Sequence, residues 1–110
     1  MTESTAAVLL RVFVGELDTH EGQPLYQWLI EEAKRRGLAG ATAFRGLEGF
    51  GVHHQLHTAK VLHLSVDLPI IVEVIDTEDN INAFLPILDA AMAEGLATTE
   101  RVEARFYQNT

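Results

Sequence analysis

The chain has 110 residues, 47% of them apolar, so we expect one folded domain with a modest core. Sixteen acidic residues against eight lysines and arginines give a formal charge of −8, which argues against a protein that binds nucleic-acid phosphates. The absence of cysteine excludes disulfides, thiolate metal sites and cysteine nucleophiles.

The first predicted element is a strand over residues 7–14 (AVLLRVFV), an apolar run that is ended by Gly15. The polar stretch 15–22 has glycine at both ends and predicts a loop. No basic leader precedes the strand, and no apolar run approaches the roughly 18 residues of a membrane span. We therefore expect no signal peptide, no membrane insertion and a cytoplasmic location.

A helix is predicted next, with Pro24 in its first turn and Gly37 as its C-terminal stop. Its apolar face repeats at helical spacing, at Leu25, Trp28, Leu29 and Ala33. On the solvent side, the spacing predicts two i,i+4 ion pairs, namely Glu31 with Arg35 and Glu32 with Arg36.

Residues 40–51 predict a strand that becomes irregular near its end, because glycines recur there at positions 46, 49 and 51. The polar segment 52–60 and the alternating residues 61–66 predict a loop with one arm of an exposed hairpin. The run at 69–76 (PIIVEVID) is the clearest strand signal in the chain.

A second helix is predicted to begin after Thr77 as N-cap, with Glu78 and Asp79 in its first turn. Its apolar stripe consists of Ile81, Phe84, Leu85, Leu88 and Met92. Pro86 lies inside this pattern and would cost about 3 kcal/mol unless the helix kinks or begins late. Gly95 ends the helix, and residues 101–107 predict a last strand.

This order of elements predicts an α+β fold, a ferredoxin-like βαββαβ sandwich that forms a single domain over residues 1–110 with its core at about 7–107. Two helices cover only one face of a four-stranded sheet. The strand residues that point the other way are mostly apolar, namely Leu9, Phe13, Ile71 and Ile75, although Arg11 and Glu73 lie among them. Burial of such a face against sister chains is favourable, so we expect self-association.

Several ordered blocks of sequence resemble one known family. They are FVGE (13–16), GQPLYQWLIEEAKRRGLAGATAFRGLEGFG (22–51), HTAKVLHLSVDLPIIVEVIDTEDNINAFLPILD (57–89) and EGL (94–96). Together they resemble the domain of unknown function 190 family, a branch of the PII-like signalling proteins. The resemblance implies a non-enzymatic, homotrimeric regulator or sensor that binds a small molecule, in relatives an adenine nucleotide, in clefts between subunits.

The same resemblance implies a mobile loop at residues 51–68 that contacts a target protein. Genes of the family often lie near fluoride-channel genes, so a membrane transporter or channel is the implied partner. The glycine-rich phosphate loop of the relatives is matched here only by residues 95–99 (GLATT), which departs from the pattern for tight triphosphate binding.

Candidate ligand-binding residues lie after the first and second core strands. Gly46, Gly49 and Gly51 would let backbone N–H groups approach an anion, and Arg45 beside them supplies a guanidinium. Glu16 could accept from a ribose hydroxyl or an adenine amine. On the loop, His57 and Lys60 complete the predicted set.

A metal site is the alternative prediction, because four of the five histidines fall at positions 53, 54, 57 and 63. His53, His54 and His57 could bind zinc or copper, with Glu48 or Asp67 as a further ligand, as in a trimer similar to the divalent-cation tolerance proteins. The loop groups Asp18, His20 and Glu21 lack a positioned nucleophile. We therefore predict no catalytic residue.

Overall fold

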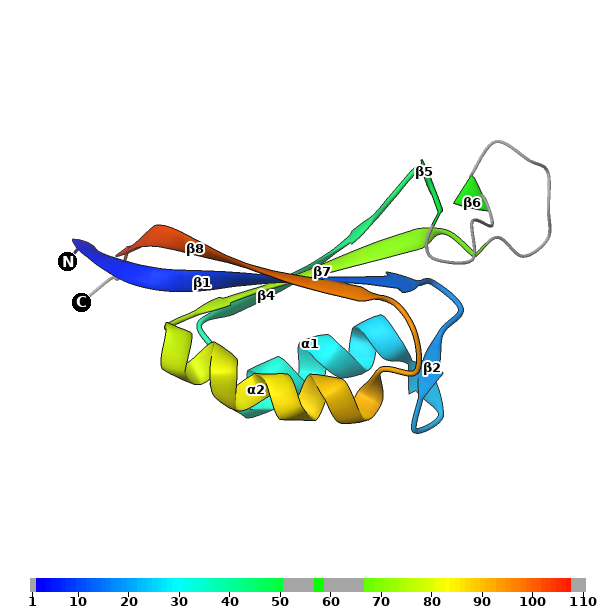
Figure 1. Ribbon diagram of the computed structural model, residues 1–110, viewed down its shortest axis with the longest axis horizontal. Helices are drawn as coiled ribbons and strands as arrows, with labels where there is room; N and C mark the ends of the chain where they lie inside the picture. The colour runs from blue at the N-terminus through cyan, green and yellow to red at the C-terminus, as the bar shows by residue number, and fades with distance from the viewer. Residues whose placement is uncertain (1, 51–56, 59–66, 108–110) are drawn as a thin grey trace.

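The computed structural model describes residues 2–50, 57–58 and 67–107, and within them a four-stranded antiparallel sheet carries two helices on one face (Figure 1). The strand order is β4-β7-β1-β8. These strands are β1 (Thr2–Gly15), β4 (Gly40–Arg45), β7 (Pro69–Asp76) and β8 (Leu96–Tyr107). The helices are α1 (Leu25–Arg35) and α2 (Glu78–Ala91), so the predicted ferredoxin-like βαββαβ architecture is confirmed.

The core lies between the sheet and the helices. Alternate residues of β1 and β7 point into it, and Leu10, Val12 and Val72 are completely buried. The helices contribute the predicted apolar residues, of which Leu25, Leu29, Ala33, Ile81, Phe84 and Leu88 are buried. Trp28, Leu85 and Met92 pack at the margin of this cluster.

The first and last strands of the βαββαβ pattern along the chain, β1 and β8, are longer than the sequence indicates. β1 and β8 pair from Thr2↔Tyr107 to Phe13↔Leu96, so each gains about five residues over the predicted ranges 7–14 and 101–107. Their far ends form a two-stranded ribbon that extends beyond the helices (Figure 1). Residues 96–100 (LATTE) show no alternation that marks a strand, but pairing with β1 holds their backbone extended. The segment 95–99, matched above to a phosphate loop, is therefore mostly strand.

Helix α1 begins at Leu25, with Pro24 as its N-cap, so Pro24 precedes the first turn in which it was predicted to lie. Gly37 follows the helix at a φ of +76°, as predicted. Of the two predicted ion pairs, Glu32 with Arg36 is confirmed, whereas Arg35 pairs with Glu32 and not with Glu31. Glu32 is buried and accepts from both Arg35 and Arg36, the latter at 3.0 Å, whereas Glu31 accepts from Gln27. Burial acts to raise the pKa of Glu32, but the two guanidinium hydrogen bonds outweigh it and the pKa is lowered.

Helix α2 runs through Pro86 as one continuous helix and does not begin late. The hydroxyl of Thr77 accepts a hydrogen bond of 3.3 Å from the N–H of Asn80, which confirms the predicted N-cap. No helix in the part of the chain that the structure describes is long and apolar enough to span a membrane.

The loop predicted at 15–22 contains β2 (Thr19–His20), which pairs with β3 (Gln23–Pro24) directly after the loop to form a short hairpin. The His20 ring lies edge-on to Trp28, with ring centroids 4.4 Å apart, and so connects this hairpin to α1. Two-residue strands carry no alternation pattern, which is why the sequence predicted only a loop.

The strand predicted at 40–51 stops at Arg45. Beyond it, β5 (Glu48–Gly49) pairs with β6 (His57–Thr58) as a separate two-stranded piece. The hairpin arm predicted at 61–66 lies outside the described residues.

The sheet face opposite the helices, here called the open face, is built from cross-strand rows. One row is apolar across all four strands and consists of Phe44, Ile71, Phe13 and Leu96. The next row is polar and consists of Thr42, Glu73, Arg11 and Thr98. Arg11 pairs with Glu73 of this row at 2.8 Å and with Glu100 of the following row at 3.2 Å. The hydrogen bond to Glu73 is the main cause of the raised pKa of Arg11. The apolar face with embedded charges that the sequence predicted is therefore present.

Candidate ligand-binding site

Two of the predicted ligand residues, Glu16 and Arg45, meet at one end of the sheet. Arg45 ends β4 and Glu16 follows β1, and the Arg45 guanidinium donates to the Glu16 carboxylate. The two strands lie on either side of β7, so the pair bridges the start of that strand. The Arg45 side chain is 61% exposed and that of Glu16 is 19% exposed. The guanidinium thus lies where an anion in solution can reach it.

Backbone hydrogen bonds to the start of β7 hold both residues in place. The N–H of Glu16 donates to the carbonyl of Leu68 at 2.8 Å. The N–H of Gly46, directly after Arg45, donates to the carbonyl of Pro69 at 2.7 Å. The backbone positions of the pair are therefore set by main-chain hydrogen bonds to two neighbouring carbonyl groups, those of Leu68 and Pro69.

Two carboxylates at this end stabilise the loop after β1. Asp18 Oδ2 accepts from the N–H of Gly15 at 2.8 Å, and Asp67 Oδ1 accepts from the N–H of Leu17 at 3.0 Å. The sequence predicted Asp67 as a further metal ligand and treated Asp18 as a loop group. An aspartate three residues after a strand-ending glycine is a signal for the Asp18 bond. The Asp67 bond crosses 50 residues and has no local signal.

The glycines of the predicted set pack closely against Pro69. A Cβ on Gly46 would lie 2.8 Å from Pro69 Cγ, and one on Gly49 would lie 3.4 Å from the same atom. Because the N–H of Gly46 already donates to Pro69, it is not free for an incoming phosphate. Close packing is the physical reason for glycine at position 46.

The remaining predicted residues fall wholly or partly outside the described part of the chain. Gly51, His53, His54, Lys60 and His63 are among them, and of His57 only the backbone is described, paired in register with Gly49. Within residues 2–50, 57–58 and 67–107, no group of three histidine, aspartate or glutamate side chains could hold a metal ion.

Large apolar side chains surround this end of the sheet. Leu17, Leu47 and Phe50 are exposed, Leu47 at 80%, and Phe44 of the apolar row directly precedes Arg45. β4 is an edge strand, so its outer side has no strand partner within the described sheet. Arg45 thus lies at a border that a second molecule could cover.

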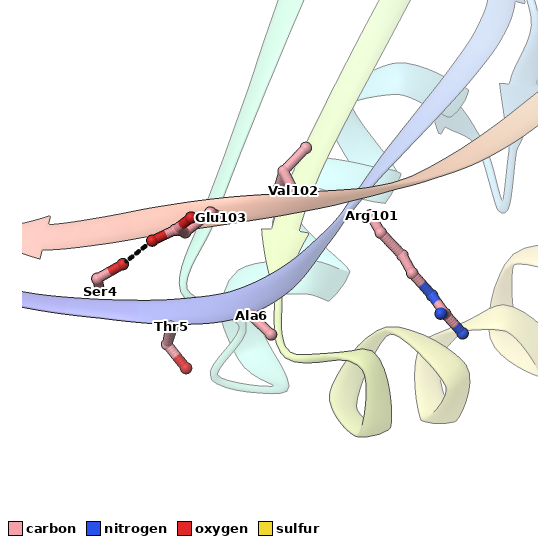
Figure 2. Close-up of a pocket in the computed structure, with 6 residues that line it drawn as sticks. All are labelled: Ser4, Thr5, Ala6, Arg101, Val102 and Glu103. Carbon is pink, nitrogen blue, oxygen red and sulfur yellow. Dashed lines mark hydrogen bonds between the residues drawn. The ribbon is translucent and has the colours of Figure 1, made fainter.

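Two surface hollows lie elsewhere. One of about 330 Å³ lies on the β1–β8 ribbon and is lined by Ser4, Thr5, Ala6, Arg101, Val102 and Glu103 (Figure 2). Another of about 250 Å³ lies between α2 and β8, where Arg101 and Glu78 form an ion pair of 3.3 Å. Neither of these two hollows is lined by a predicted ligand residue.

Comparison with known proteins agrees with this architecture. The model of the family DUF190, described as "Uncharacterized ACR", matches residues 7–104. A UPF0166 protein of Aquifex aeolicus is 43% identical over 95 residues, which cover 86% of this chain and 90% of that protein.

Solved structures show the same fold at lower identity. A putative PII-like signaling protein from Thermus thermophilus superposes with a TM-score of 0.67 at 21% identity, over 93% of this chain and 92% of that chain. CPII, a nitrogen regulatory PII-like protein from Thiomonas intermedia solved with ADP, AMP and bicarbonate, gives a TM-score of 0.62 at 17% identity over 93% and 91%. These similarities establish a PII-like fold.

Proposed function

The chain belongs to the DUF190 family and has a PII-like fold, and from this premise we propose that it is a non-enzymatic regulatory protein that binds a small anionic metabolite at the Glu16–Arg45 pair. The observation that carries the proposal is the exposed guanidinium of Arg45, fixed at the end of an edge strand beside an apolar row. An exposed arginine in a chain of charge −8 is a favourable place for an anion.

The proposed assembly is a homotrimer. The apolar row of the open face favours contact with other copies, because four apolar side chains leave water together. In the described part of the chain the sheet also has two different edge strands, β4 and β8, so pairing between edges is head-to-tail and can close into a ring. In such a ring a neighbour lies beside β4, and the Arg45 site becomes a cleft between subunits.

An adenine nucleotide is the proposed ligand. The CPII structure with ADP and AMP supports this choice, and a guanidinium suits a phosphate because it donates two parallel hydrogen bonds. Residues 96–99 belong to β8, so in this proposal the phosphate contacts come from Arg45 and the predicted residues Gly49, Gly51, His57 and Lys60.

The proposed partner is a membrane transporter or channel contacted through residues 51–68. This part of the proposal rests on the family resemblance, as does the choice of a fluoride channel. Light scattering and calorimetry on the purified chain test the parts that concern the protein itself.

We expect a particle of three times the 12.2 kDa chain mass and heat of binding with ATP, ADP or AMP. Arg45→Gln should abolish the heat, whereas the control Lys34→Gln, which removes an exposed positive charge on α1, should not. A monomer at micromolar concentration would contradict the shared cleft. Absence of heat with all three nucleotides at millimolar concentration would contradict the proposal that an adenine nucleotide is the ligand.

A further inference from the structure

The contact between Arg45 and Glu16 neutralises the group that an anionic ligand needs. The two side chains differ in exposure, since Arg45 is mostly exposed and Glu16 mostly covered. A ligand that approaches from solvent therefore meets the guanidinium first and finds the carboxylate on its inner side.

The Glu16 side chain can leave Arg45 without disturbing the fold. Its own N–H is bonded to Leu68, and the N–H of the next residue, Leu17, is bonded to Asp67. These bonds fix the backbone on both sides of the carboxylate, so its release needs only side-chain rotation. An ion pair with one partner this exposed is weak enough to exchange in solution.

We infer that Glu16 is an internal counter-ion of Arg45 that the anionic group of the ligand displaces, and that it thereby determines which anions bind. The inference rests on the proposed ligand site. It assigns Glu16 a competing role in place of the direct contact with ribose or adenine that the sequence suggested.

Displacement has a consequence for specificity. A singly charged carboxylate ligand would replace one carboxylate by another and gain little from Arg45. A phosphoryl group carries nearly two negative charges and three strong acceptor oxygens, so its attraction to the guanidinium exceeds that of Glu16. The chemistry of the pair thus favours phosphorylated metabolites over simple carboxylates.

The test compares Glu16→Gln with the wild-type chain, using calorimetric titrations of ADP, acetate and adenosine. Glutamine keeps the size and an acceptor oxygen but removes the competing charge. We expect ADP to bind about fivefold more tightly to Glu16→Gln, because the competing ion pair is gone. Acetate should gain measurable affinity, and adenosine, which has no charge for Arg45, should not change.

The matched control is Asp89→Asn, which removes one exposed negative charge from α2 and gives the same net charge. If it tightens ADP binding as much as Glu16→Gln does, the effect is one of overall charge and the inference fails. Weaker binding of ADP and adenosine to Glu16→Gln would assign Glu16 a direct nucleoside contact and also overturn it. If neither protein binds ADP, the proposed nucleotide function fails and the inference falls with it.

Discussion

The carboxylate of Asp76 accepts a hydrogen bond of 2.9 Å from the backbone N–H of Ala39, and so connects the end of β7 to the residue before β4. The same carboxylate accepts from the Thr77 N–H at 2.6 Å and from Asn80 Nδ2 at 2.9 Å. One buried side chain thus orders the start of α2 and the start of β4 together.

Asp76→Ala should lower the free energy of unfolding by about 3 kcal/mol, because it leaves partly buried donors without an acceptor. Urea denaturation followed by circular dichroism measures this change. The control Asp79→Ala, at an exposed position in the first turn of α2, should lose less than about 1 kcal/mol. Equal losses for the two variants would contradict the role of Asp76.

The stability of the fold should fall at acid pH because of two buried carboxylates. Burial acts to raise the pKa of Asp76, but its hydrogen bonds from Asn80, Thr77 and Ala39 outweigh burial and lower it, as the arginines do for Glu32.

A lowered pKa in the folded chain means that the unfolded chain binds more protons. The stabilisation is therefore complete above the ordinary values of 3.8 for Asp and 4.5 for Glu, and is lost as the pH falls through the folded pKa values. Unfolding free energies measured between pH 7 and pH 2 should show this decline. The Asp76→Asn variant should lose less stability over this pH range. A loss equal to that of the wild-type chain would show that Asp76 does not contribute to the pH dependence.

Gly95→Ala should destabilise the chain strongly. Gly95 has a φ of +130°, and a Cβ there would lie 2.8 Å from the backbone oxygen of Phe13, which cannot move without distorting β1. We expect a loss of about 3 kcal/mol or more in thermal unfolding. Gly37→Ala is the control, since Gly37 has a φ of +76° but open space around it, and should lose only about 1 kcal/mol.

Phe44→Lys should disrupt self-association without unfolding the chain, because Phe44 is 46% exposed in the single chain and lies on an edge strand. Light scattering should report a mass near 12.2 kDa for this variant. Ala90→Glu, at an exposed position of α2 on the opposite face of the sheet, should keep the wild-type mass. A Phe44→Lys protein that assembles normally would exclude the open face as the interface.

Local patterns accounted for most of the fold. The strand at 69–76 and the helices after Pro24 and Thr77 depend on patterns among residues close together in the chain, so the sequence alone predicted them. The length of β8 could not be predicted from the sequence, because residues 96–100 are extended only through pairing with β1. The ion pairs of Glu32 were half predicted, because spacing indicates Arg36 but cannot show that Glu32 is buried.

The composition and order of residues by themselves determined the α+β class, the two helices, the apolar character of the open face and the family. These properties depend on short-range periodicity and on blocks of sequence. Only the tertiary structure decided that Glu16 and Arg45, 29 positions apart, are partners, and that Asp67 supports the loop beside them. The physical reason is that β1 and β4 both pair with β7, and strand pairing brings distant side chains to one end of the sheet.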